Sequence, residues 1–120
     1  MANQLEGKPL ASADEVKSFP LGKVELVTLA GVTIGRATMQ PGWRWSQSVK
    51  PLVKTERCQV GHTGYMVSGR MRVAMADGAE QEFGPGDAFA IPPGHDAWVV
   101  GDEPAVNIDF GGASVFAAAL

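Results

Sequence analysis

The sequence predicts an all-β protein, an antiparallel jelly-roll β-barrel made of one domain. Short apolar runs are separated at even intervals by turn residues such as Ser68-Gly69, Asp77-Gly78 and Pro92-Pro93-Gly94. No run has the sustained apolar period of a long helix, whereas 15 glycines and 8 prolines supply the turns that a jelly roll needs. A chain of 120 residues can enclose one sizeable core, so we expect a single domain over residues 1–120.

The first twenty residues are expected to cover one end of the barrel. Ser12 and Glu15 have the spacing of a capping box, which predicts one short helical turn that Pro20 ends. The next two runs, residues 23–30 and 32–39, are rich in β-forming residues and are separated by a glycine turn. We expect these two runs to form an antiparallel pair.

Three aromatic residues are candidates to line a substrate pocket. Trp43 and Trp45 are two positions apart, so their indoles share one face of an extended segment; ordinary core packing is the alternative role. Tyr65 is the third candidate, although its odd position in the run that contains His62 would turn it outward. Residues 46–55 show no period and are predicted to form a loop, a flap near the open end of the barrel.

Charge and composition exclude several classes of partner. The net charge is -3, the sequence pI is about 5.3 and the ten basic residues are scattered, so no nucleic-acid surface is expected. A single cysteine cannot form an internal disulfide, and residues 1–10 lack the regions of a secretory signal, which favours a cytoplasmic location. No run approaches the roughly 18 apolar residues of a membrane helix, so no membrane partner is expected.

Four side chains that can bind a transition metal lie in two distant segments. Glu56, Cys58 and His62 are all even-numbered, so along one strand they project to the same side. His95, the only other histidine, ends a second run that begins at Gly86. If that side is the barrel interior, carboxylate, thiolate and imidazole ligands converge in one site.

The spacing around these residues resembles the first motif of the cupins. In that family a glutamate is followed by six residues and a glycine, and here His62 stands at the glutamate position before Gly69. Cys58 and Glu56 stand at the two histidine positions of the motif, and Lys50 stands at its opening glycine. The framework is therefore present while the family's ligands are replaced.

A second segment resembles the other cupin motif. Its framework positions are Gly86, Pro92 and Gly94, and its histidine and asparagine positions hold Ala97 and Gly101. His95 lies two residues before the expected histidine, which preserves its side of a strand. The resemblance covers residues 42–101 and implies a barrel that holds a divalent metal and acts on a small organic molecule.

The ligand types permit several metals and also none. Two histidines with Glu56 would suit non-haem iron, retention of the Cys58 thiolate would favour zinc, and manganese or nickel are further candidates. An enzyme of this kind would be an oxygenase, lyase or isomerase, and the sequence assigns no catalytic residue. Because every family ligand is replaced, the alternative is a metal-free module that binds or senses a small molecule in the cavity.

Other residues could support or replace the metal chemistry. Asp96, Asn107 and Asp109 could orient a ligating imidazole, or they could lie on the surface and in turns. In the run that contains the last two, these polar residues alternate with apolar ones, so one face is either barrel interior or exterior. Cys58 and His62 could form a nucleophile and base, but on an extended strand they would be roughly 13 Å apart, too far for proton transfer.

The chain is expected to form a two-fold homodimer. A barrel of this size buries only about two-thirds of its unfolded surface, and many cupins, by resemblance, pair through their N-terminal strands. The apolar tail at residues 111–120 could dock on a neighbouring subunit. The competing outcome is a monomer whose tail folds back over its own barrel.

Overall fold

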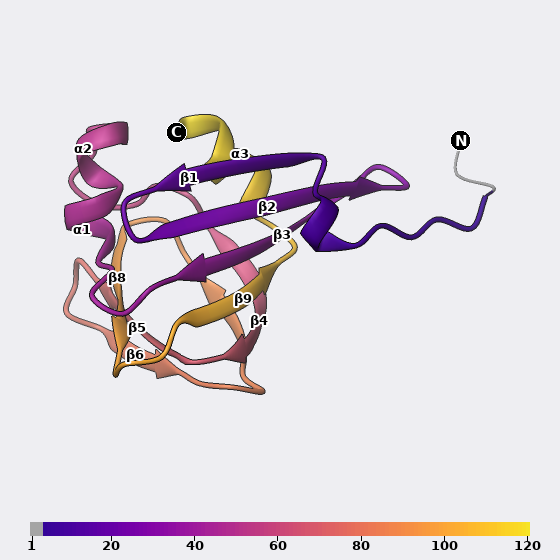
Figure 1. Ribbon diagram of the computed structural model, residues 1–120. Helices are drawn as coiled ribbons and strands as arrows, with labels where there is room; N and C mark the ends of the chain where they lie inside the picture. Colours follow the sequence, from indigo (N-terminus) through magenta and orange to yellow (C-terminus); the bar gives the residue numbers. More distant parts are fainter. Residues whose placement is uncertain (1–3) are drawn as a thin grey trace.

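The chain folds into two antiparallel sheets that enclose one main core, as the turn spacing predicts (Figure 1). The computed structural model describes residues 4–120, so the first three residues of the predicted cover segment lie outside the described residues. The larger sheet has the strand order β1-β2-β3-β9-β4-β7, and the smaller sheet has the order β6-β5-β8. The strands are β1 (Glu15–Phe19), β2 (Gly22–Leu29), β3 (Val32–Met39), β4 (His62–Ser68), β5 (Arg70–Met75), β6 (Glu80–Phe83), β7 (Ala88–Ile91), β8 (His95–Val100) and β9 (Ala105–Asp109).

The predicted antiparallel pair is confirmed as the hairpin β2–β3. Gly22 pairs with Met39 at one end of the hairpin, and Leu29 pairs with Val32 at the other. The two-residue turn between the strands has positive φ angles, which matches the right-handed twist of the paired strands. Strand β9 then lies between β3 and β4, so the last strand of the chain joins the N-terminal hairpin to the strand that begins at His62.

The N-terminal segment differs from the prediction. Its helical turn lies at Leu10–Ser12, and residues 15–19 form β1, which extends the larger sheet instead of covering a barrel end. Strand pairing satisfies the backbone N–H and C=O groups along the edge of β2, which an isolated helical turn could not do. The carboxylate of Asp14 accepts hydrogen bonds from the N–H of Thr28 and from Lys8, and so ties the segment to the hairpin.

Residues 46–55 are mostly helical, and the predicted loop is therefore wrong. The short helices α1 (Trp45–Ser48) and α2 (Lys50–Val53) lie at one end of the barrel (Figure 1). Val49, between them, is fully buried, and the Ser48 hydroxyl donates to the carbonyl of Pro20 over 2.6 Å. Helices this short contain too few residues for a period to be visible in the sequence.

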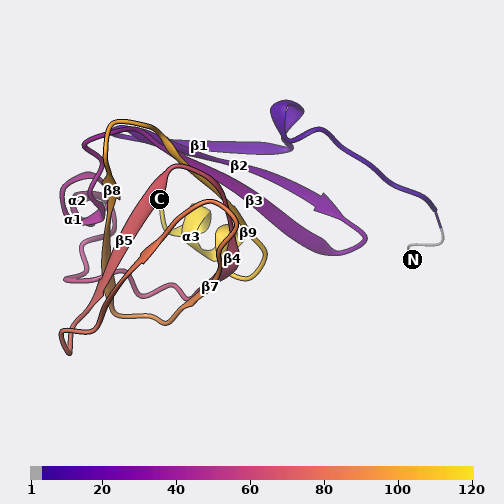
Figure 2. The ribbon, with the colours of Figure 1, turned by 90° about the horizontal axis from the view of Figure 1, so that it is seen from below.

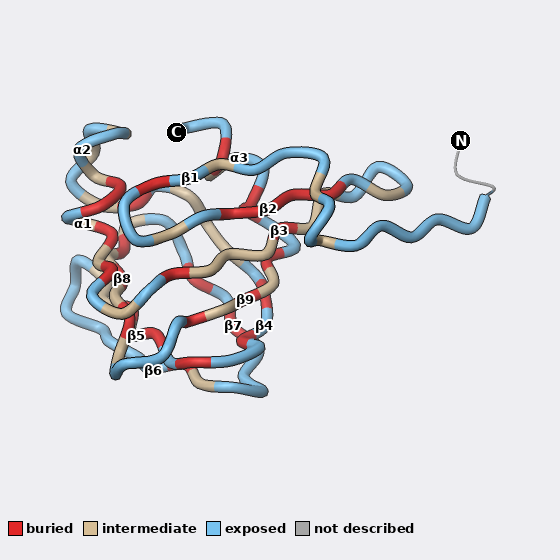
Figure 3. The backbone as a smooth tube through the Cα atoms, in the orientation of Figure 1, coloured by how far each residue is buried: buried red, intermediate tan, exposed pale blue. Residues whose placement is uncertain are grey.

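Burial alternates along several strands (Figure 3), and in β9 two of the buried residues are polar. In β5, Met71 and Val73 are buried and belong to the main core. In β9, Asn107 and Asp109 are buried, whereas Val106 and Ile108 are only half-buried. The polar face of β9 is therefore the barrel interior, one of the two alternatives that the sequence leaves open.

The C-terminal tail forms helix α3 (Ala113–Ala119), which packs on the chain's own barrel. Ala113 and Ala117 form one buried apolar cluster with Val24 and Leu26 of β2. A side chain at Gly35 of β3 would collide with Ala113, so the glycine allows the close approach. The tail thus packs on its own subunit, against β2 and β3 (Figure 2). Among the helices of residues 4–120, none is long and apolar enough to span a membrane.

Candidate metal centre

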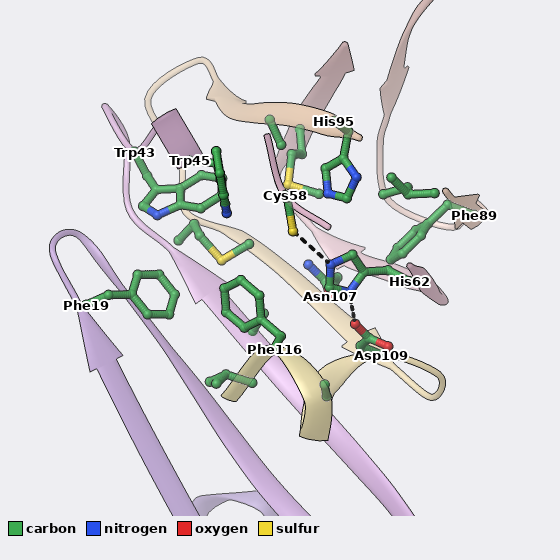
Figure 4. A pocket seen from close by; sticks show the side chains of 17 residues that line it. Phe19, Trp43, Trp45, Cys58, His62, Phe89, His95, Asn107, Asp109 and Phe116 are labelled. Carbon is green, nitrogen blue, oxygen red and sulfur yellow. Dashed lines mark hydrogen bonds and ion pairs between the residues drawn. The ribbon is translucent and has the colours of Figure 1, made fainter. Parts of the chain in front are cut away.

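Three of the four predicted metal ligands lie together inside the barrel. Cys58, His62 and His95 each place one ligand atom within 4.8 Å of the others (Figure 4). Cys58 and His95 are buried, and the N–H of Cys58 donates to the carbonyl of His95 over 2.8 Å. This backbone contact and the start of β4 at His62 join the two distant segments into one group that can hold a metal ion.

The chain bends between Cys58 and His62, where the sequence predicted a continuous strand. Cys58 makes only an isolated bridge to His95, and β4 begins at His62. Because of the bend, Cys58 Sγ lies 4.0 Å from His62 Nε2. The predicted separation of roughly 13 Å, which had argued against a nucleophile and base pair, is therefore wrong.

The structure does not bring Glu56 to this group. Its side chain is 93% exposed, and Lys50 Nζ donates to Glu56 Oε2 over 3.0 Å. Residues 54–57 have no regular secondary structure, so the parity rule of a strand does not apply to them. The group consists of one thiol and two imidazoles without a carboxylate ligand.

Each imidazole has its Nδ1 atom held by a fixed acceptor. His62 Nδ1–H donates to Asp109 Oδ2 over 2.5 Å, and His95 Nδ1–H donates to the carbonyl of Pro92 over 2.8 Å. These bonds orient both rings and leave Nε2 of each ring to bind a metal. Metal-binding histidines in proteins usually show this pattern, with a carboxylate or carbonyl behind the ligand.

Of the three residues that could orient an imidazole, Asp109 is the one that hydrogen-bonds to a histidine ring. It is buried, and its Oδ1 accepts the N–H groups of Gly111 at 3.0 Å and Gly112 at 2.8 Å. A side chain at Gly112 would collide with His62 Nδ1 and with the backbone of Gly61. The glycines after β9 thus allow the chain end to wrap closely around the carboxylate.

The other two candidates have different surroundings. Asp96 accepts hydrogen bonds from Arg44 Nε at 3.2 Å and from the N–H of Ser46 at 3.1 Å, so it holds α1 and not an imidazole. Asn107 is 5% exposed on the same inner face of β9 as Asp109. Within residues 4–120, its side chain takes part in none of the hydrogen bonds around the group.

The group carries a charged pair in the metal-free protein. Burial opposes the thiolate, but hydrogen bonds from His62 and His95 outweigh burial and lower the pKa of Cys58 to about 6. Burial also opposes the imidazolium, but Asp109 and Cys58 outweigh it and raise the pKa of His62 to about 9. Burial would raise the pKa of Asp109 as well, and the hydrogen bond and charge of His62 lower it instead. A thiolate and an imidazolium therefore face each other at neutral pH.

A cavity of about 60 Å³ adjoins the group (Figure 4). Trp43 and Trp45 line it and are 4% and 2% exposed, so they form its wall and also pack in the main core. Their indole N–H groups are buried, and among the described residues 4–120 no acceptor partners them. Tyr65 lies outside the cavity on the outer face of β4 and is 45% exposed.

Most of the remaining wall is apolar, and the sequence reasoning missed these residues. They include Phe19, Met39, Met71, Phe89 and Phe116. The ring of Phe116, from α3, lies 5.9 Å from the His62 ring and 5.8 Å from that of Phe19. The tail shows no alternation that could have assigned Phe116 to the cavity. Phe89, in contrast, lies in the short apolar run at residues 88–91, where alternation was the available signal.

His62 also borders the outside of the barrel. An open depression of about 560 Å³ is lined by His62 together with residues that include Gly61, Thr63, Pro92 and Val115. The His62 side chain is 15% exposed, whereas Cys58 and His95 are buried. His62 is therefore the member of the group that separates the inner cavity from the surface.

The sequence matches the model of the EutQ-like cupin domain over residues 32–110, which is well over half of the chain. None of the curated proteins compared with the chain is a significant match.

Solved structures share the fold at low sequence identity. A protein of unknown function from Rhizobium leguminosarum has a TM-score of 0.62 at 21% identity, over 90% of this chain and 98% of that protein. A sugar phosphate isomerase of the cupin superfamily from Silicibacter pomeroyi has a TM-score of 0.62 at 17% identity, over 89% of this chain and 75% of that protein. An oxalate decarboxylase from Lactobacillus farciminis, in a formate complex, has a TM-score of 0.57 at 20% identity over 82% of this chain, which spans only 31% of that protein.

Proposed function

Because the chain belongs to the EutQ-like cupin domain family, we propose that it binds one divalent transition metal in its barrel and acts on a small organic molecule there. One observation carries this proposal. Both histidines of the group have Nδ1 fixed by Asp109 or by a carbonyl, so that Nε2 of each is left for a metal beside the Cys58 thiol. Buried histidines that serve only in packing do not need two such oriented rings around one thiol.

The donor atoms fit a metal of the zinc type. Metal bonds of about 2.0–2.3 Å place the donors of a tetrahedral site roughly 3.3–3.6 Å apart. The present separations, 4.0 Å between Cys58 Sγ and His62 Nε2 and at most 4.8 Å within the group, require only a small contraction. With Glu56 outside, no carboxylate completes the two-histidine iron site, and a thiolate with two imidazoles favours zinc.

Three protein ligands would leave one position for a substrate. Such a metal supplies Lewis-acid chemistry when bound. The chain's own residues divide the other tasks. Asp109 orients His62, while the apolar wall with Trp43 and Trp45 excludes water and limits the size of the substrate. His62 stands between the cavity and the outer depression, so access from the surface passes beside this ring.

Elemental analysis of protein purified without an affinity tag tests metal binding. We expect close to one equivalent of zinc, a marked loss in His62→Gln, and no loss in the control Glu56→Gln, because Glu56 lies outside the group. Less than about a tenth of an equivalent of any transition metal, with no uptake on titration, would contradict the proposal.

A second candidate is a metal-free module that binds a small molecule in the same cavity. The observation that favours it is the charged pair of Cys58 and His62, which satisfies both groups without a metal. Retained ligand binding and unchanged metal content in His62→Gln would support this second candidate. Loss of metal and of ligand binding together would support the first.

A further inference from the structure

Cys58 borders two spaces, one inside the barrel and one that opens to the surface. It lines the inner cavity of about 60 Å³ and also an outer depression of about 150 Å³ beside α2 and α3. Trp45 and Phe116 line both spaces as well, so these three side chains form the partition between them (Figure 4). A small solute that enters the depression from the surface therefore meets the thiol at this partition.

The contacts of the Cys58 thiol are those of a nucleophile. Its Sγ lies 4.0 Å from Nε2 of His62, and Nδ1–H of the same ring donates to Asp109 Oδ2 over 2.5 Å. This tautomer leaves the lone pair of Nε2 beside the sulfur, so the ring can accept the thiol proton and pass it to a leaving group. A nucleophile, a base and a group that orients the base are the arrangement that activates cysteine and serine in enzymes. A cysteine that only fills space in a core needs no such partners.

The space around the thiol limits the reagent that it can meet. Cys58 is 3% exposed. An engineered cavity of about 150 Å³ holds one benzene molecule, so the inner cavity of about 60 Å³ admits only roughly two or three non-hydrogen atoms. The walls of both spaces are mainly apolar, which favours an uncharged solute over an ion. Hydrogen peroxide, a single O–O pair without charge, satisfies both conditions, whereas a charged disulfide of peptide size satisfies neither.

We propose that Cys58 is a modification site for hydrogen peroxide, which oxidises the thiol to a sulfenic acid with His62 as the proton carrier. The sulfur attacks one peroxide oxygen, so an S–O bond forms and the O–O bond breaks. The sulfur is oxidised, and the second oxygen is reduced and leaves as water after it receives the thiol proton from His62 Nε2. One thiol and one peroxide thus give one sulfenic acid and one water.

The modification would change the metal site. A sulfenic acid no longer offers the thiolate that binds a metal. Because the chain has a single cysteine, no internal disulfide can follow. Oxidation therefore removes one of the three ligands and weakens metal binding. This consequence rests on the proposed function, whereas the modification itself needs no metal.

The test compares the folded and the urea-unfolded full chain, both treated with EDTA. Each is exposed to hydrogen peroxide and quenched in urea with dimedone, which traps sulfenic acids, and mass spectrometry of the peptide that contains Cys58 gives the rate. We expect the folded chain to react at least about tenfold faster, because proton transfer through His62 outweighs burial. With iodoacetamide the order should reverse, since this larger reagent reaches a buried thiol only after local opening.

A substitution tests the proton carrier. His62→Gln should react with peroxide about 100-fold more slowly than the wild type when folded, and at the wild-type rate when unfolded. A change that only loosened the packing would instead speed up the reaction with iodoacetamide, so the two reagents separate the two effects. Glu56→Gln is the matched control, because Glu56 is two positions from Cys58 but lies outside the group, and it should react like the wild type.

The outcomes separate this inference from the proposed function. The inference is overturned if the folded wild type reacts with peroxide no faster than the unfolded chain, or if His62→Gln reacts like the wild type. Should His62→Gln fail to fold, the comparison of folded and unfolded wild type decides by itself.

Zinc measurements test the consequence for the metal site. Zinc-loaded protein should resist peroxide, and oxidised protein should bind zinc at least about tenfold more weakly than the reduced protein. Equal zinc affinities of the two forms would contradict the effect of oxidation on the site. Absence of zinc uptake by the reduced protein contradicts the proposed function, and the peroxide rates of the EDTA-treated protein then still decide the role of Cys58.

Discussion

At the scale of single residues, the site depends on a chain of contacts from Asp109 through His62 to Cys58. The carboxylate fixes the imidazole, and the imidazole faces the thiol at 4.0 Å. Asp109 favours the protonated form of His62, and His62 in turn favours the thiolate of Cys58. The pKa of Cys58 is therefore low although burial opposes the thiolate. Substitutions along this chain should therefore act on metal affinity and on pH dependence in predictable directions.

We expect Asp109→Asn to weaken zinc binding about 10- to 100-fold, because the imidazole loses the carboxylate that orients it and increases its basicity. Competition with a chromophoric chelator measures the affinity. Asp96→Asn, whose carboxylate contacts Arg44 and not an imidazole, is the control and should bind zinc like the wild type. Equal affinities for the two variants would contradict the role of Asp109.

The pH dependence of stability should differ between the EDTA-treated wild type and Cys58→Ala. The pKa of His62 is raised from 6.5 to about 9. The protonated ring therefore contributes fully to the free energy of unfolding below pH 6.5, and this contribution is lost as the pH rises toward 9. The pKa of Cys58 is lowered from 9.0 to about 6, so its contribution grows over nearly the same range. The two effects oppose each other, and the wild type should change little between pH 6.5 and 9.

Removal of Cys58 leaves only the effect of His62, whose pKa Asp109 still raises. The free energy of unfolding of Cys58→Ala should therefore fall by on the order of 1–3 kcal/mol between pH 6.5 and 9, because one pKa unit corresponds to about 1.4 kcal/mol. Urea unfolding at a series of pH values measures this loss. Parallel curves for the two proteins would show that the charged pair does not form.

At the scale of elements, β9 and α3 place the site. Strand β9 carries its polar residues inward, which brings Asp109 to His62 and leaves Val106 and Ile108 on the outer face. Helix α3 then packs against β2 and β3 and adds Phe116 to the cavity wall. The tail is therefore part of the barrel core of its own subunit.

A charge on the buried side of α3 should destabilise the whole domain. Ala117 is 1% exposed, whereas Ala118 is exposed on the other side of the same helix. We expect Ala117→Glu to lower the free energy of unfolding by about 2–4 kcal/mol, because a buried carboxylate lacks a partner. Ala118→Glu should stay within about 0.5 kcal/mol of the wild type. Urea unfolding of both variants is the measurement, and similar values would mean that α3 is not docked.

At the scale of the whole molecule, the outer face of the larger sheet is unusually apolar. Several large apolar residues on this face are about half exposed, namely Val16 of β1, Val32 of β3, and Tyr65 and Val67 of β4. The strand register places Val16, Val32 and Tyr65 opposite the inner face that holds Asn107 and Asp109, and Val67 lies at the register shift after Met66. Exposed apolar patches of this kind usually mark an interaction surface.

The homodimer remains a prediction, and this outer face replaces the docked tail as its proposed contact. Light scattering with size-exclusion chromatography should give a mass near twice 12.6 kDa. Val67→Lys combined with Tyr65→Glu should shift the mass to that of a monomer, because charges would be buried in the contact. Val115→Glu is the control, since Val115 is 60% exposed on α3, away from this face. A monomeric wild type at micromolar concentration would rule the dimer out.

The sequence by itself determined most of the strands after β1, most of their turns and the nature of the metal-capable residues, because alternation and turn chemistry are local properties. It also placed Cys58, His62 and His95 in one barrel by their resemblance to cupin motifs. Only the tertiary structure decided which residues meet. The bend before His62 removed Glu56 and brought Cys58 close, while the pairing of β9 with β4 brought Asp109 to His62 across 47 positions of sequence. Such contacts depend on how distant strands pair and bend, and no local pattern encodes that.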